Sequence, residues 1–168
     1  MSIIYGGIDH GASGGAAYVD ESGILMSYIR FSNTTWADVS IFLNPVKIFP
    51  AKAECKFLIE RVAARPAYRD DGQGGFKVMQ GISSTFKFGY NAGLVEGLLI
   101  GHGHPYEFVA PAVWQRALGC LSGGDKNVTK AKAQQLWPEH HRWTKEEPDA
   151  CLIAEYCRRH ALGLLKKS

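Results

Sequence analysis

Three acidic residues lie where an acidic side chain is costly unless it performs chemistry. Asp9 ends an apolar run that begins at residue 3, Glu60 lies inside an apolar run over residues 57–62, and Asp149 opens a helical pattern. Each has an ordinary explanation alone: a turn residue, a solvent-facing or Arg-paired acid, and a charge that favours a helix start. If the strands that end near Asp9 and Glu60 are neighbours, all three carboxylates meet, and their mutual repulsion then requires a cation.

An all-oxygen cluster of this kind selects a hard ion, Mg²⁺ or Mn²⁺, over zinc. Two such ions about 4 Å apart can activate water and stabilise a leaving oxygen, which is the chemistry of phosphodiester cleavage. A fourth acid is expected just before Asp149. Glu146 lies three residues earlier and is favoured over Glu147, although Pro148 suits the first position of a helix and would leave Glu146 outside it.

The elements that must position these acids can be predicted from spacing. Apolar runs predict strands over residues 3–9, 16–19, 24–29, 55–62 and 108–110, with a hairpin turn at 20–23. Helical spacing predicts helices over 83–102, 111–118, 129–137 and 148–162, whereas the polar, Gly-rich stretch 65–75 is expected to form a loop. Strands first, followed by alternating strands and helices, indicate one α/β domain over residues 1–168 with helices on the faces of a mixed sheet.

Glycines recur every fourth residue within the predicted helix 83–102, at Gly89, Gly93, Gly97 and Gly101. Each costs roughly 1 kcal/mol relative to alanine inside a helix. A stripe of glycines therefore predicts close packing of this helix face on the sheet or on a second copy of the chain, with close approach to a nucleic-acid backbone as the alternative.

Composition excludes several classes of protein. In 168 residues, hydrophobic side chains make up 46% and charged ones 21%, which is ordinary for a folded domain, and the net charge is +3. The basic excess lies in residues 123–145 and 157–168, as expected for a nucleic-acid-binding side. No apolar run suggests a signal peptide or a membrane span, so we expect a cytoplasmic protein, in the nucleoid or in a phage-infected host, and no membrane partner. The cysteines show no metal-site spacing and are expected to be small buried hydrophobes.

Five segments, in order and with matching spacing, resemble the RuvC-like Holliday junction resolvases. They are Gly7–Gly14, Leu58–Val62, Phe86–Gly93, Pro111–Gly119 and Pro148–Tyr156. The resemblance extends from residue 3 to about residue 160. It implies an RNase H-like fold, a five-stranded mixed sheet whose first three strands are antiparallel, flanked by helices. It also implies a homodimer that binds branched DNA, especially four-way junctions, and cuts it by paired, Mg²⁺-dependent hydrolysis.

The family's acidic tetrad falls on Asp9, Glu60, Glu146 and Asp149, and a family lysine near the cut phosphate falls on Lys126, which could stabilise transition-state charge. Two family features are missing. The aromatic that wedges into the junction is replaced by Ala63 and Ala64, so Tyr68 or Phe76 is the expected substitute. The second family lysine is also absent. The expected DNA contacts are Arg61, Tyr68, Phe76, Lys77, Arg116 and Lys130.

Two other functions compete with a structure-selective endonuclease. The Asp9 segment also resembles the phosphate loop of sugar kinases and actin-like ATPases, but those need two such domains and an adenosine site. A non-catalytic junction-binding protein could retain the fold, although intact acids at every ligand position argue against it.

Overall fold

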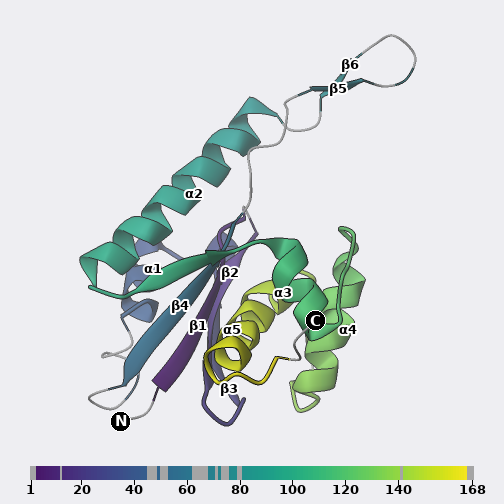
Figure 1. Ribbon diagram of the computed structural model, residues 1–168. Coiled ribbons are helices and arrows are strands. Elements are labelled where there is room, and N and C mark those ends of the chain that lie inside the picture. The colour runs from purple at the N-terminus through teal and green to yellow at the C-terminus, as the bar shows by residue number, and fades with distance from the viewer. Residues whose placement is uncertain are drawn as a thin grey trace.

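The computed structural model describes residues 3–11, 13–44, 49, 53–61, 68–70, 72, 76–78, 81–140 and 142–165. Its centre is a five-stranded sheet in the order β3-β2-β1-β4-β7 (Figure 1). The strands are β1 Ile3–Asp9, β2 Gly15–Asp20, β3 Leu25–Arg30, β4 Glu54–Glu60 and β7 Tyr106–Val109. β1, β2 and β3 are antiparallel, whereas β4 and β7 run parallel to β1. The predicted RNase H-like sheet is confirmed.

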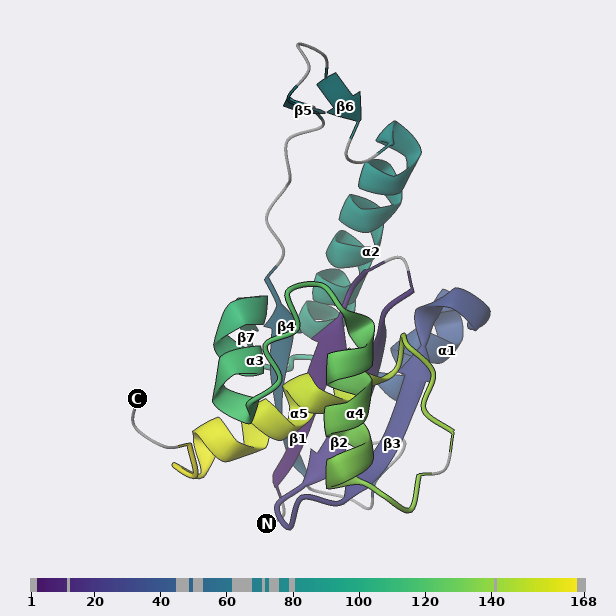
Figure 2. The same ribbon diagram turned by 90° about the vertical axis from the view of Figure 1, so that its right-hand side faces the viewer.

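Helices cover both faces of the sheet (Figures 1 and 2). One face carries α3 Pro111–Leu118, α4 Lys126–Leu136 and α5 Pro148–Ala161, and the other carries α1 Trp36–Phe42 and α2 Ile82–Gly101. The period-two alternation of β1 explains the two layers, because Tyr5 packs with α5 while Ile4 and Ile8 pack in the cluster that contains Val95 of α2.

The central helix α5 crosses β1 so closely that the backbones of the two elements are in contact at Gly7. A Cβ added to Gly7 would lie 2.1 Å from the backbone nitrogen of Ala154 and 2.3 Å from the carbonyl oxygen of Ala150. Only glycine permits this approach. Residues 148–157 of α5 are all buried, so Asp149 in its first turn is fixed against the sheet.

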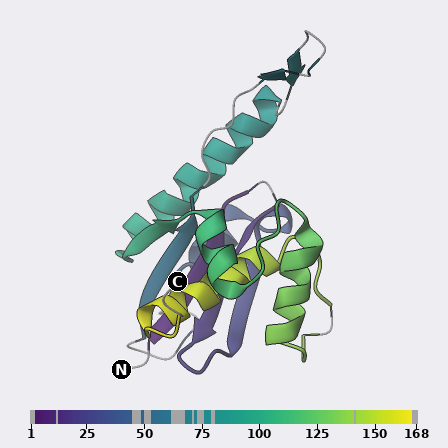
Figure 3. The same ribbon diagram turned by 45° about the vertical axis from the view of Figure 1, so that its right-hand side comes forward.

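The glycine stripe of α2 does not pack on the described sheet, which excludes the first of the two packing partners predicted for it and leaves a second copy of the chain untested. A Cβ added at Gly89, Gly93, Gly97 or Gly101 would meet no heavy atom of the described chain within 4 Å. The opposite face supplies the packing, through Val95 and Leu99, and the N-terminal half of α2 extends beyond the sheet (Figure 3). The physical reason is that spacing defines a helix face but not what lies opposite it.

Local differences from the prediction are small. The stretch 65–75, expected to be a loop, contains the short strand β5 Tyr68–Asp70, which pairs antiparallel with β6 Phe76–Val78 directly after it. α1 and the short 3-10 helix Phe31–Asn33 were not predicted, and α4 begins at Lys126, three residues before the expected start. All four cysteines are buried and free, as expected. None of the described helices combines the length and apolar character that a membrane crossing needs.

Candidate active site

Asp9, Glu60 and Asp149 line one cleft of about 450 Å³. Asp9 and Glu60 are the last residues of the parallel neighbours β1 and β4, so their side chains leave the same edge of the sheet. α5 brings Asp149 to that edge across the face of β1. All three side chains are buried, at 8%, 8% and 4% exposure. The three acids expected to meet therefore line one cleft, and its remaining wall comes from the turn after β1, α2, α3, the loop before α4 and Lys126.

The Asp9 carboxylate is held by the turn that follows β1. Its Oδ1 accepts a hydrogen bond of 2.9 Å from the backbone N–H of Gly11. Burial raises the pKa of Asp9, and the nearby Asp149 carboxylate raises it further, against the opposing effects of the Gly11 N–H and Lys126. The cleft is therefore short of positive charge at the end of β1.

The Glu60 carboxylate, like that of Asp9, is buried and accepts a hydrogen bond from a neighbouring N–H group. Its Oε1 accepts a hydrogen bond of 3.0 Å from the indole Nε1 of Trp114 in α3. Burial, followed by the charge of Asp9, raises the pKa of Glu60 to about 7, although the Trp114 hydrogen bond acts in the opposite direction. Two carboxylates with raised pKa values in one cleft mark it as a candidate functional site.

Lys126 is the cation that the chain itself supplies. As the first residue of α4, it donates from Nζ to Oδ2 of Asp149. Burial lowers the pKa of the Lys126 ammonium, but the charge of Asp149 and this hydrogen bond outweigh burial, so the pKa is raised. The other carboxylate oxygen of Asp149, Oδ1, is buried and has no hydrogen-bond partner among the described residues.

These residues fit a hard divalent ion by their chemistry. The donors are all carboxylate oxygens, one of them is an unpartnered buried atom, and three carboxylates face one ammonium in the cleft. With Lys126 on Asp149, no group of three or more acidic, histidine or cysteine side chains in the described ranges is close enough to share one ion. An ion shared by all three carboxylates would need them closer together than they lie here.

The expected fourth acid does not line the cleft. Glu146 is half-buried in the turn before α5 and is absent from the cleft wall. Glu147 is 5% exposed and bonded elsewhere: its Oε2 accepts from the backbone N–H of Thr144 at 3.0 Å, and its Oε1 lies 3.5 Å from Nε of Arg30. The Glu147 side chain is thus engaged with β3 and its own turn, whereas Glu146 takes part in the turn through its backbone N–H, which donates to the Thr144 hydroxyl at 3.4 Å.

The residues expected to contact DNA are dispersed. Arg61 is exposed, with its guanidinium 5.3 Å from the centre of the Phe108 ring. Arg116 lies outside the cleft, in a groove of about 730 Å³ between α3, α4 and α5 that also contains Lys132 and Arg159. Lys130 is half-buried on α4. The side chains of Tyr68, Phe76 and Lys77 lie outside the described part of the structure.

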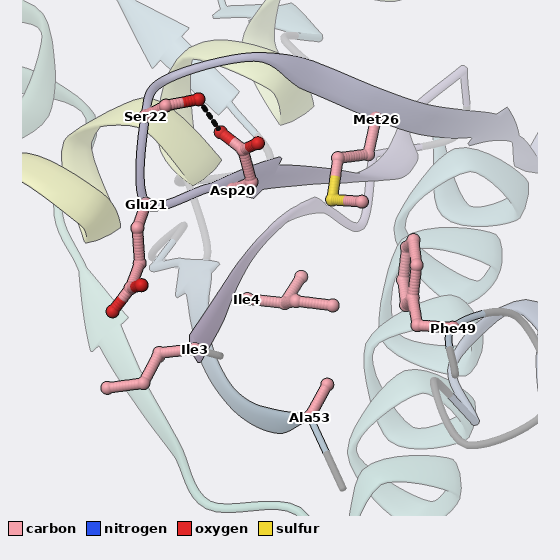
Figure 4. Close-up of a pocket in the computed structure, with 8 residues that line it drawn as sticks. All are labelled: Ile3, Ile4, Asp20, Glu21, Ser22, Met26, Phe49 and Ala53. Atoms are coloured by element: carbon pink, nitrogen blue, oxygen red, sulfur yellow. Dashed lines mark hydrogen bonds between the residues drawn. The ribbon is translucent and has the colours of Figure 1, made fainter. Parts of the chain in front are cut away.

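A second hollow, at the opposite end of β1, contains none of the candidate residues (Figure 4). Its wall is mostly apolar, with Asp20 and Glu21 at one side. The Asp20 carboxylate already accepts from the Ser22 hydroxyl at 2.7 Å and from the Ile24 N–H at 2.9 Å, and these bonds lower its pKa although burial opposes them. Asp20 is therefore a turn residue, not a candidate for catalysis.

Two aromatic residues at the site were not singled out by the sequence analysis. Trp114 is fully buried against Glu60, and Phe88 of α2 lines the cleft while its ring lies 4.6 Å from that of His10. Both belong to segments that carried the resemblance, but an aromatic in an apolar helix is usually a core residue. Nothing in the sequence distinguished these two.

Comparison with solved structures places this arrangement in a known fold. "T. thermophilus RuvC in complex with Holliday junction substrate" superposes with a TM-score of 0.65 at 15% identity over 98% of both chains. "Thermus thermophilus RuvC structure" superposes with a TM-score of 0.60 at 17% identity over 99% of both chains. The chain has the RuvC fold. Its sequence matches no protein-family model and none of the curated proteins.

The likeness to RuvC extends over the elements that form the cleft. The matches cover nearly the whole of both chains, so the elements that carry Asp9, Glu60 and Asp149 all lie within the shared fold. The RuvC neighbour in the first comparison is bound to a Holliday junction. At these identities the likeness establishes the fold, and the chemistry must be argued from the residues of this chain.

Proposed function

We propose that this protein is a metal-dependent endonuclease that resolves four-way DNA junctions. The observation that supports this most directly is the cleft that holds Asp9, Glu60 and Asp149 beside Lys126, in a chain with the RuvC fold. Buried carboxylates of this number are costly for folding, and the chain compensates them only in part with one lysine. A cluster of buried acids that destabilises the fold in this way is expected to serve a function, and binding divalent ions is one that carboxylates can perform.

The proposed mechanism divides the work among these residues. The site would hold two divalent ions, Mg²⁺ or Mn²⁺. Their ligands would be Asp9, Glu60 and Asp149, with Glu146 as a fourth ligand from the turn before α5. When bound, such ions supply an activated water and stabilise the leaving oxygen of a phosphodiester. The Gly11 N–H and the Trp114 indole fix the orientation of their carboxylates. Lys126 is placed to neutralise charge that develops on the phosphate in the transition state.

Basic side chains around the cleft would bind the DNA arms. We assign phosphate contacts to Arg61, Arg116 and Lys130, with Arg116 serving an arm that reaches the groove between α3, α4 and α5 rather than the cleft. Tyr68, Phe76 and Lys77 remain the candidates for the junction centre on sequence grounds. Because phosphate contacts release counterions, binding should weaken steeply with salt. A flat salt dependence would contradict this assignment.

The exposed face of α2 is the proposed contact between two copies of the chain. Its glycines lie in open space, and Phe86 and Tyr90 on the same helix are 72% and 53% exposed. Two such helices can approach closely only if small residues line the contact, and two cuts in one junction need two sites. Gly93→Leu should then leave the folded monomer intact but abolish dimerisation in sedimentation analysis. A stable Gly93→Leu dimer would exclude this face.

The function is tested with a labelled mobile four-way junction in Mg²⁺, with the cut positions mapped on each strand. We expect paired, symmetric nicks from the wild type. Asp9→Asn should abolish the nicks and keep junction binding in EDTA, whereas the exposed Glu139→Gln should cut like the wild type. If the wild type binds the junction but never nicks it, the protein is a non-catalytic junction-binding protein. If it cuts linear duplex equally well, the structure selectivity is wrong.

A further inference from the structure

Trp114 is placed to control the carboxylate of Glu60. The strand β7 pairs in parallel with β4, with Val109 opposite Glu60, and α3 starts two residues later at Pro111. The first turn of α3 therefore lies beside the end of β4, and Trp114 projects from it. The Trp114 side chain is fully buried, and its Nε1 donates to Oε1 of Glu60 at 3.0 Å.

The chemistry of this contact is directional. An indole N–H can only donate, so it binds a carboxylate oxygen and offers nothing to a cation. A buried carboxylate oxygen that accepts from a fixed donor loses its freedom to rotate, and a charge-assisted hydrogen bond of this kind is roughly twice as strong as a neutral one. Oε1 is thereby engaged on the α3 side, while the Glu60 side chain also lines the cleft.

Trp114 itself is not part of the cleft wall. From α3 the wall takes Pro111, Ala112 and Gln115, while Trp114 lies behind them. It therefore has no surface to offer to DNA or to an ion, and any effect on the reaction must pass through Glu60.

We infer that Trp114 is a positioning residue that holds Glu60 in the orientation needed to bind a divalent ion. The inference rests on the proposed function only in taking Glu60 as an ion ligand. Groups that orient metal ligands from behind typically change metal affinity or activity by about 10–100-fold when they are removed. The predicted effect is thus large enough to separate from a general loss of packing.

The chain contains a matched control. Trp137 is also buried, at 2% exposure, and its Nε1 donates to the carbonyl oxygen of Gly23 at 3.0 Å, but it takes no part in the cleft. Trp114→Phe and Trp137→Phe each remove one indole donor and keep an aromatic ring. Their comparison isolates the contact with Glu60 from the ordinary cost of a lost buried hydrogen bond.

The test is a Mn²⁺ titration by calorimetry without DNA, together with thermal unfolding in EDTA. Trp114→Phe should weaken Mn²⁺ binding about tenfold, whereas Trp137→Phe should lower the melting temperature and leave Mn²⁺ affinity unchanged. In a Glu60→Gln background, Trp114→Phe should weaken the remaining Mn²⁺ binding less than about twofold, because interacting residues are non-additive. Mn²⁺ should also quench the fluorescence of Trp114, seen as quenching that Trp114→Phe loses.

The outcomes separate the inference from the proposed function. Equal Mn²⁺ affinities for the wild type and Trp114→Phe would overturn the inference, and so would an effect of Trp114→Phe that is undiminished in the Glu60→Gln background. Absence of Mn²⁺ binding by the wild type would overturn it as well. Mn²⁺ binding that depends on Trp114, in a protein that never cuts junctions, would support the inference and reject the proposed function.

Discussion

The ammonium of Lys126 donates to the Asp149 carboxylate, and so joins the first residue of α4 to the first turn of α5. A lysine at a helix N-terminus is disfavoured by the helix dipole, whereas an aspartate there is favoured. The pair therefore places one charge against its local preference. Asp149 offsets that cost in the folded protein, and the arrangement keeps a cation inside a cleft that Asp9 and Glu60 make negative.

Lys126→Ala separates the two roles of this lysine. We expect cleavage of a four-way junction to fall by about 100-fold, the usual loss when one group that stabilises transition-state charge is removed. Mn²⁺ binding should become tighter, because Oδ2 of Asp149 no longer has a competing ammonium. Single-turnover cleavage and calorimetry measure these effects. Lys56→Ala, an exposed lysine on β4 that does not line the cleft, is the control and should cut like the wild type. An unchanged Mn²⁺ affinity in Lys126→Ala would rule out the competition.

The sequence predicted the parts of the fold and site that depend on patterns along the chain. Apolar runs predicted strands over residues 3–9 and 55–62 that carry Asp9 and Glu60, and Pro148 marked the start of the helix that carries Asp149. These patterns did not show which strands are neighbours; the meeting of the three acids was conditional on that adjacency, which only the resemblance implied. The short helix α1 was missed, since it buries only Val39 and Phe42 and leaves almost no period to detect.

The features that could not be predicted depend on contacts between residues that are far apart in the sequence. The glycines of α2 defined a face, but only the structure shows that the face is open. Trp114 had the pattern of a core residue, which it is, and its hydrogen bond to Glu60 depends on how α3 leaves β7. β5 lies in the polar, Gly-rich stretch 65–75 and β6 directly follows it, and strands of three residues are too short for a period to be recognised in the sequence.

Glu60 should make the metal-free protein less stable as the pH rises. Its pKa is raised from an ordinary value near 4.5 to about 7 by burial and by Asp9, so the folded state binds its proton more tightly than the unfolded chain does. The free energy of unfolding should therefore fall between about pH 4.5 and pH 7. Glu60→Gln should flatten this dependence and stabilise the protein at pH 8 by on the order of 2 kcal/mol, with little gain at pH 4. Urea unfolding in EDTA at the two pH values measures both effects, and a wild-type stability that rises over this range would refute them.

Substitution of Glu147 should lower stability, whereas substitution of Glu146 should lower metal binding and cleavage. Glu147→Gln should lower the melting temperature, because it removes the negative charge facing Arg30 and weakens the bond to Thr144 in the turn before α5. Glu146→Gln should leave the melting temperature nearly unchanged and reduce both Mn²⁺ affinity and junction cleavage, if its carboxylate closes on the cleft as the fourth ligand. Thermal unfolding and calorimetry on the two variants decide between them. A normal cutting rate in Glu146→Gln would remove Glu146 from the site.

Gly7 should determine how closely α5, and with it Asp149, approaches the ends of β1 and β4. In Gly7→Ala the new Cβ would lie 2.1 Å from the backbone nitrogen of Ala154, and backbone atoms must move because no flexible side chain is there to yield. We expect a loss of about 3 kcal/mol in the free energy of unfolding, at the upper end for overpacking, and weaker Mn²⁺ binding because Asp149 moves with its helix. Gly101→Ala is the matched control. It adds the same methyl group to an open position at the end of α2 and should cost nothing, or stabilise the helix by up to about 1 kcal/mol. If Gly7→Ala lowers stability but binds Mn²⁺ like the wild type, the position of α5 does not control the geometry of the acidic site.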